Sequence, residues 1–186
     1  DGGKTWTPSA SAWDWPWEKD GEQWSEADPS LVVDAETQKI FLFGNVIRWE
    51  RSKRKGDQPY RHFVQESADN GATWSKPREI TSEIAFPEWP FGKPTGIGRP
   101  DAENAQIFIP SGSGTQLRDG TLLHTICRVG LGIALIGSVD HGRSWKRIGR
   151  VIPCKGDECK VVELGDGTWM INLRRDNGRR EVFRSV

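Results

Sequence analysis

An eight-residue motif that recurs at a nearly constant interval is the strongest constraint on the fold of this chain. Residues 67–74 read Ser-Ala-Asp-Asn-Gly-Ala-Thr-Trp, and residues 138–145 read Ser-Val-Asp-His-Gly-Arg-Ser-Trp. Residues 1–6, Asp-Gly-Gly-Lys-Thr-Trp, repeat the pattern without its first two positions. Successive motifs end on tryptophans that are 68 and 71 residues apart. A fixed period of this kind indicates a repeat architecture.

The shared pattern, Ser-x-Asp-x-Gly-x-(Thr/Ser)-Trp, has the chemistry of a tight turn. An aspartate accepts hydrogen bonds from backbone amides further along the turn, and glycine adopts the positive φ that other residues resist. The tryptophan is expected to anchor the turn by burying its ring against a sheet. We therefore interpret the aspartates of these motifs as structural and not catalytic.

Between the motifs the sequence is typical of short strands joined by turns. Three hairpins are predicted, in residues 31–43, 115–123 and 161–171, with turns at 34–37, 118–120 and 165–167. No segment of ten or more residues shows helical periodicity. About four strands in each interval of about 70 residues fit one blade of a β-propeller. The prediction is an all-β fold in one domain, residues 1–186, without an interdomain linker.

Composition agrees with this class and excludes several others. Ten Trp, 21 Gly and 11 Pro suit many short strands and turns. Lys+Arg and Asp+Glu are both 26, so there is no basic excess to support a nucleic-acid or membrane-surface partner. No apolar run approaches the ~18 residues of a membrane span. The three histidines lack cysteines or carboxylates at ligand spacing, which argues against a zinc site, and no cofactor is expected.

The three cysteines leave two possibilities open. Cys154 and Cys159 could close a short disulfide loop in an oxidising compartment, with Cys127 unpaired. An odd and small number of cysteines is equally consistent with three free thiols.

The last predicted hairpin places a carboxylate near a guanidinium. If Gly165, Asp166 and Gly167 form a three-residue loop, Glu158 lies opposite Arg174, with Cβ atoms roughly 5 Å apart. A two-residue loop would shift the pairing by one residue and place the two side chains diagonally. From the residues alone, the pair is either a surface ion pair worth under about 1 kcal/mol or part of a functional site.

The repeated motif resembles the Asp-boxes of the sialidase (neuraminidase) family. Residues 27–33, Ala-Asp-Pro-Ser-Leu-Val-Val, resemble the Asp-Pro-(Ser/Thr) strand that follows the first box in that family. Residues 112–122 resemble its glycine-rich hairpin, and residues 158–174 resemble its Glu-x-x-x-x-Glu…Asn-x-Arg segment. The resemblance covers nearly the whole chain, in family order. It implies a six-bladed β-propeller, with about three blades in residues 1–186 and Asp-boxes at 1–6, 67–74 and 138–145.

The resemblance also implies an activity, the retaining hydrolysis of terminal sialic acid, and roles for individual residues. Arg174 matches the middle one of three arginines that hold the substrate carboxylate. Glu158 matches the base that activates a tyrosine nucleophile. Asp28 matches an aspartate that binds polar groups of the sugar, and Trp49 falls where relatives place an aromatic residue of the N-acyl pocket. We interpret Glu163 as a structural partner within its hairpin and not as the base.

Other residues of the family site have no match in this chain. The first arginine and the acid–base aspartate precede the first Asp-box in the family, and the third arginine and the tyrosine nucleophile follow several blades later. Tyr60 is the only tyrosine, and its position does not match the nucleophile. We therefore expect this chain alone to be an incomplete sialidase. A half-ring would expose sheet surfaces, so either aggregation or self-association of half-propellers is also expected.

Two other functions compete with the sialidase hypothesis. One is a non-catalytic, lectin-like propeller that binds sialic acid, and the other is a structural Asp-box protein without a sugar site. The expected partners are sialylated glycans. A secreted or cell-surface location is expected from the family, although the chain carries no visible signal peptide. Linkage preference and the choice between hydrolysis and transfer stay open.

Overall fold

The computed structural model describes residues 1–7, 11–14, 18–19, 22–49, 60–84, 107–175 and 178–185. Across these ranges the chain forms three β-sheets and no helix. The predicted all-β fold is therefore confirmed. None of these residues belongs to a helix that could cross a membrane.

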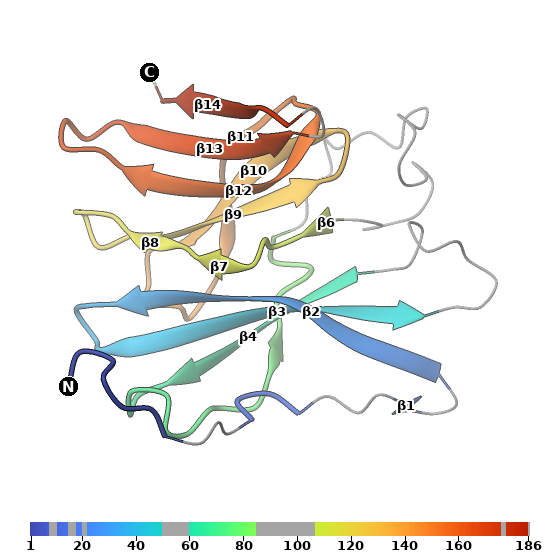
Figure 1. The fold of residues 1–186 in the computed structure, drawn as a ribbon, viewed down its shortest axis with the longest axis vertical. Helices are drawn as coiled ribbons and strands as arrows, with labels where there is room; N and C mark the ends of the chain where they lie inside the picture. The colour runs from blue at the N-terminus through green and yellow to red at the C-terminus, as the bar shows by residue number, and fades with distance from the viewer. Residues whose placement is uncertain are drawn as a thin grey trace.

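The sheets follow one another along the chain, and their strands are almost all antiparallel. The first sheet contains β1 (Glu18–Lys19), β2 (Glu22–Asp34), β3 (Lys39–Trp49), β4 (Tyr60–Ser67), β5 (Arg78–Glu79) and β7 (Gly112–Ser113). The second contains β6 (Ile107–Phe108), β8 (Thr115–Gln116), β9 (Leu122–Arg128), β10 (Gly132–Ser138) and β11 (Lys146–Ile152). The third contains β12 (Gly156–Glu163), β13 (Trp169–Arg175) and β14 (Arg180–Arg184). Figure 1 shows them stacked in this order, as in successive blades of a propeller.

All three predicted hairpins are present. Residues 35–38 turn between β2 and β3, residues 118–120 turn between β8 and β9, and residues 165–167 turn between β12 and β13. In β2, Val32 is buried while Leu31 and Val33 are exposed, as the period-two pattern requires. Every residue of β9 and β10 is buried, because the second sheet is covered on both faces.

The hydrophobic core lies between the sheets. Between the first and second sheets, the Trp145 ring packs edge-on against Phe41 and Phe43, with centroid distances of 5.8 and 4.7 Å. Between the second and third sheets a separate cluster includes Cys127 and Cys159. Each pair of neighbouring sheets thus shares its own core. Of the two possibilities for the cysteines, the structure has three free thiols and no disulfide between Cys154 and Cys159.

A short parallel pairing joins the first sheet to the chain segment that starts the second. Ser30 of β2 pairs with Gly112 of β7, and the Gly114 amide donates to the Leu31 carbonyl oxygen at 2.9 Å. Gly112 has a φ of +112°, a value that a residue with a side chain rarely adopts. This contact joins β2 of the first sheet to the segment that connects β6 with β8 of the second sheet.

The Asp-box turns have the predicted hydrogen bonds. In the second box, Asp69 Oδ1 accepts from the Thr73 amide at 2.8 Å, and in the third, Asp140 Oδ1 accepts from the Ser144 amide at 3.0 Å. In the first, Asp1 Oδ2 accepts from the Thr5 amide at 2.9 Å. These aspartates are occupied with turn contacts, which agrees with a structural role.

The tryptophans of the three boxes differ, and one prediction about them is wrong. Trp145 is fully buried and Trp74 is partly buried, but 88% of the Trp6 surface is exposed. Residues 1–7 pair with no strand among the described residues, so no sheet surface covers the Trp6 ring.

Asp34 links the first sheet to the second through its buried carboxylate. Its Oδ2 accepts from His141 Nδ1 of the third Asp-box at 2.8 Å, and its Oδ1 accepts from Gln116 Nε2 at 3.0 Å. Burial alone would raise the pKa of Asp34, but hydrogen bonds from Thr37, His141 and backbone amides outweigh it and hold the pKa at about 2.

The low pKa of Asp34 predicts a loss of stability in acid. Because the pKa is depressed in the folded state, the stabilisation is present above the unfolded value near 4 and disappears as the pH falls to about 2. The free energy of unfolding, measured with urea between about pH 5 and pH 2, should therefore fall with pH. Asp34→Asn should be less stable at pH 5 and should show a shallower decrease. An unchanged slope in the variant would contradict this assignment.

Candidate active site

The candidate site lies at the end of the sheets opposite the Asp-boxes. In the first sheet, Ile40 pairs with Ser67 beside the second Asp-box, whereas Ile47 pairs with Tyr60 at the other end. Asp28 lies midway along β2, next to Ala27, which pairs with Asn45; Asn45 in turn pairs with His62, two residues from Tyr60. In the third sheet, Arg174 is near the end of β13 that is remote from the turn at 165–167. Figure 1 shows the strands that carry these residues.

Arg174 is held between two carboxylates. Its Nε and Nη2 donate to Asp157 Oδ1 and Oδ2 at 2.9 and 3.1 Å, and its Nη1 lies 2.9 Å from Glu158 Oε2. The Asp157 contact is a two-point fork, which fixes the plane of the guanidinium. About half of the Arg174 and Glu158 side chains is exposed, so both remain accessible to a ligand.

The predicted hairpin pairing is correct near the turn and wrong at Arg174. Leu164 and Thr168 close a three-residue loop, and Lys160 pairs with Asn172, as the prediction requires. A β-bulge between Asp157 and Lys160 then shifts the register, so Arg174 pairs with Asp157 and not with Glu158. The bulge nevertheless leaves the Glu158 carboxylate within ion-pair distance of Arg174.

Asp28 lies on a second β-bulge, between Ala27 and Ser30. Both Asp28 and Glu158 have positive φ angles, +55° and +39°, which are uncommon for residues with side chains. Such backbone is found at functional sites, where a bulge re-aims a side chain. A β-bulge with a positive φ angle thus sets the direction of each carboxylate, Asp28 in the first sheet and Glu158 in the third.

Asn45, a residue that the sequence analysis did not single out, holds Asp28 in place. Its Nδ2 donates to Asp28 Oδ2 at 3.2 Å and to the Ile109 carbonyl at 2.9 Å. Its Oδ1 accepts from the Ile109 amide and from His62 Nδ1, both at 3.0 Å. Asn45 is fully buried, so this network connects the site to both the first and the second sheets.

Asp28 and Glu158 share one electrostatic environment although 130 residues separate them. Burial raises the pKa of Asp28, and the Glu158 charge raises it further, while the Asn45 hydrogen bond and the Lys160 charge act in the opposite direction. Burial and then the Asp28 charge raise the pKa of Tyr60, so this tyrosine also belongs to the neighbourhood. The sequence analysis considered Tyr60 only as a nucleophile and missed this electrostatic link to Asp28.

Trp49 and Glu163 have different surroundings. The Trp49 Nε1 donates to Ser25 Oγ at 2.7 Å, which holds the ring against its own sheet at the end of β3. Its role in an N-acyl pocket stays a prediction. Glu163 Oε2 accepts from the Arg118 amide at 2.8 Å, and Arg118 Nη2 donates to the Leu164 carbonyl. Glu163 therefore has a structural contact, but its partner is the neighbouring turn at 118–120, whereas the prediction placed that partner within its own hairpin.

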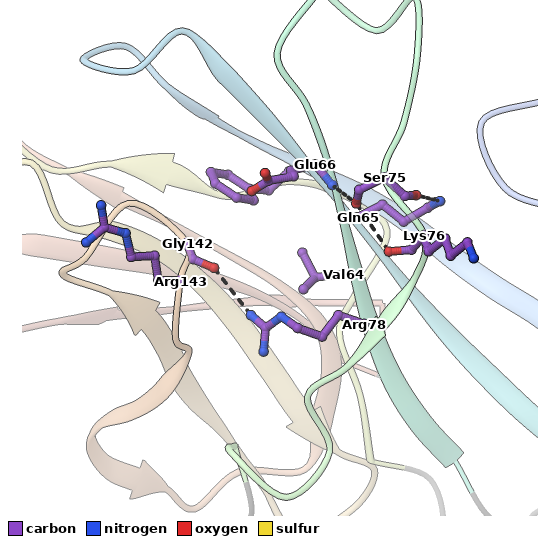
Figure 2. Close-up of a pocket in the computed structure, with 9 residues that line it drawn as sticks. Val64, Gln65, Glu66, Ser75, Lys76, Arg78, Gly142 and Arg143 are labelled. Atoms are coloured by element: carbon purple, nitrogen blue, oxygen red, sulfur yellow. Dashed lines mark hydrogen bonds between the residues drawn. The ribbon is translucent and has the colours of Figure 1, made fainter.

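Two of the cavities on the described surface bear on where the site lies. One, of about 380 Å³, is lined by Arg174, Arg175, Gly178, Arg179 and Arg180, and could receive an anionic group beside the candidate site. The other, of about 290 Å³, lies between the first sheet and the third Asp-box (Figure 2), where Arg78 donates to the Gly142 carbonyl at 3.3 Å. It contains none of the predicted site residues. Among the described residues, no cluster of His, Cys, Asp and Glu could hold a metal ion.

Three blade-like sheets, Asp-box turns at one end and an arginine–carboxylate cluster at the other define part of a sialidase-type β-propeller. The chain belongs to the BNR repeat-like domain family, which it matches over residues 1–186.

Two curated proteins that are similar in sequence to this chain are sialidases. A sialidase from Micromonospora viridifaciens is 33% identical over 175 residues, which are 86% of this chain and 24% of the relative. A sialidase from Bacteroides fragilis (strain YCH46) is 28% identical over 163 residues, 81% of this chain and 27% of the relative. The chain thus spans about a quarter of the length of these curated relatives.

Solved structures show the same architecture. The Hadza microbial sialidase Hz136 superposes on the whole chain with a TM-score of 0.79 and 25% identity, over 36% of its own length. The Trypanosoma rangeli sialidase in complex with sialic acid covers all of this chain with a TM-score of 0.70 and 20% identity, over 30% of its own length. The predicted resemblance to sialidases and the partial propeller are therefore confirmed.

Proposed function

We propose that this chain supplies part of the active site of a sialidase, a glycosidase that releases terminal sialic acid from glycoconjugates. The observation that carries the proposal is the Arg174 guanidinium, fixed by Asp157 and paired with Glu158 beside an arginine-lined cavity. A planar guanidinium recognises a carboxylate through two parallel hydrogen bonds. Sialic acid carries such a carboxylate on its anomeric carbon.

In the proposed reaction, Arg174 binds the sialic acid carboxylate and Asp28 accepts hydrogen bonds from polar groups of the sugar. Glu158 takes the proton of a tyrosine hydroxyl as the tyrosine oxygen bonds to the anomeric carbon, while the glycosidic bond breaks and an acid protonates the departing oxygen. Water then attacks the anomeric carbon and breaks its bond to the tyrosine, which regains its proton, and the sugar leaves with retained configuration. The family resemblance supports the role of Glu158. No residue of this chain matches that tyrosine or the acid that protonates the leaving group.

Binding of a dehydrated sialic-acid analogue, with its methyl ester as control, tests the proposal. The acid and the ester differ only in the charge that Arg174 would bind. We expect saturable binding of the acid, measured by isothermal titration calorimetry, and much weaker binding of the ester. Equal affinities, or no binding by a chain with the dispersed NMR spectrum of a folded protein, would contradict the proposal.

A non-catalytic sialic-acid-binding module is the second candidate, because the chain matches only one catalytic residue of the family, Glu158. It predicts analogue binding as well, so hydrolysis of a fluorogenic sialoside separates the two functions. Release of the fluorophore that is lost in Glu158→Gln, with analogue binding retained, supports the enzyme. Binding without release by the whole natural protein supports the lectin-like module.

Two further parts of the proposal concern assembly and location. The outer face of the third sheet exposes Val162 and Val182, at 42% and 53%, and a second copy of the chain would cover such a face. Self-association stays a prediction that sedimentation velocity can test, with Val182→Asp expected to favour the monomer.

A secreted or cell-surface location follows only from the proposed glycan substrates.

A further inference from the structure

Lys160 is a half-buried lysine where strands of all three sheets meet. Its Nζ lies 3.3 Å from the Cys159 carbonyl oxygen and 3.4 Å from the Pro110 carbonyl oxygen. A Cβ added to Gly112 would come within 2.8 Å of Lys160 Cε, so the side chain passes directly over this glycine. Because Gly112 pairs with Ser30 of β2, the lysine extends from the third sheet toward the first.

The surroundings of Lys160 are unusual for a cation. In the part of the chain that the structure describes, its hydrogen-bond partners are main-chain carbonyls and it forms no ion pair. A buried charge is costly unless opposite charges compensate it. Burial lowers the pKa of Lys160, while the nearby negative charges of Glu158 and Asp28 act against that decrease.

The other titratable groups around Lys160 do not replace these carboxylates. Cys159 on β12 and Cys127 on β9 are buried thiols, and burial raises the pKa of both. Burial also lowers the pKa of His124 on β9 to about 4, so its ring is neutral at neutral pH. Asp28 and Glu158 are therefore the negative charges that Lys160 meets.

We propose that Lys160 is a positioning residue of the site: its ammonium group offsets the negative charge of Asp28 and Glu158. It thereby holds Asp28 in the ionised form that accepts hydrogen bonds from a sugar. Burial and the Glu158 charge both favour protonation of Asp28, even though Glu158 is paired with Arg174, and the Lys160 charge opposes them. The consequence for sugar binding rests on the proposed function, whereas the effect on Asp28 does not.

A carboxyl NMR titration of Asp28 tests the proposal without any ligand. Removing a nearby positive charge raises the pKa of a carboxyl group, so the Asp28 midpoint should move upward in Lys160→Met. Lys160→Arg keeps the charge and should leave the midpoint near its wild-type position. Lys155→Met, at an exposed lysine just before β12, is the matched control and should change nothing. An Asp28 midpoint in Lys160→Met equal to that of the wild type overturns the proposal, provided that amide spectra show both proteins folded.

Ligand affinity provides the second measurement. Lys160→Met should bind the dehydrated sialic-acid analogue about tenfold more weakly near the Asp28 midpoint, and this loss should shrink at higher pH as Asp28 ionises again. A loss that is the same at all pH values indicates a merely structural role and overturns the proposal. If the wild type binds no analogue, the proposed function fails, but the carboxyl titration still decides the role of Lys160.

Discussion

Arg174→Ala is expected to lower the affinity for the dehydrated sialic-acid analogue by at least about a hundredfold. The substitution removes the guanidinium that would bind the ligand carboxylate. It also leaves Asp157 and Glu158 without the cation that now lies 2.9 Å from each of them. Their charges would then repel the ligand, so the loss should exceed that of one hydrogen bond. Isothermal titration calorimetry at low ionic strength measures the change.

Two further variants identify the cause of that loss. Arg184→Ala removes an exposed arginine from the distant end of β14 and should leave the affinity unchanged. Arg174→Lys keeps the charge but not the fork, and should lie between the wild type and Arg174→Ala. A wild-type affinity in Arg174→Ala would show that another group binds the carboxylate.

Gly142→Ala is expected to be the most destabilising single-methyl substitution in the Asp-box turns, by about 3 kcal/mol or more. Gly142 has a φ of +80°, and a Cβ at this position would lie 2.2 Å from two ring carbons of Phe41. Phe41 is 1% exposed and packs edge-on against Trp145, so a shift of its ring would disturb that packing. Urea unfolding gives the free energy directly.

Gly71→Ala is the matched control for this prediction. Gly71 occupies the same place in the second Asp-box, with a φ of +84°, but the nearest atom to an added Cβ is Trp74 Cζ2 at 3.6 Å. This variant has the backbone strain without the clash and should lose only about 1 kcal/mol. Equal losses in the two variants would show that the contact of Gly142 with Phe41 does not limit stability.

Local features of the fold could be predicted because local chemistry determines them. The Asp-box turns require an aspartate and a glycine at fixed offsets, and both described boxes with a full motif have the expected hydrogen bonds. The turn at 165–167 likewise follows from its two glycines, and of the two loop lengths that the sequence left open, the structure has the three-residue loop, which pairs Lys160 with Asn172. The exposure of Trp6 could not, because burial depends on which surface lies alongside the turn.

The candidate site was only partly predictable, because bulges and contacts between sheets assemble it. Neither bulge has a glycine at its left-handed position, so nothing in the sequence marks Asp28 or Glu158 as irregular. Asn45 and Lys160 matter through partners that are 64 and 50 residues away, Ile109 and Pro110. Periodicity carries no information about such pairs. The roles of Asp28, Glu158 and Arg174 came from the family resemblance.

The hydrogen bonds of Asn45 to Ile109 have a consequence for how the site comes into being during folding. Each hairpin can form from neighbouring residues, and Asn45 can contact Asp28 and His62 within the first sheet. Its two hydrogen bonds to Ile109, however, form only after the first and second sheets have docked. The network that holds Asp28 is therefore complete only after docking, when Ile109 fixes the Asn45 side chain. Hydrogen exchange should show the Ile109 amide protected only in molecules whose first two sheets are joined, and ligand binding should appear with that same protection.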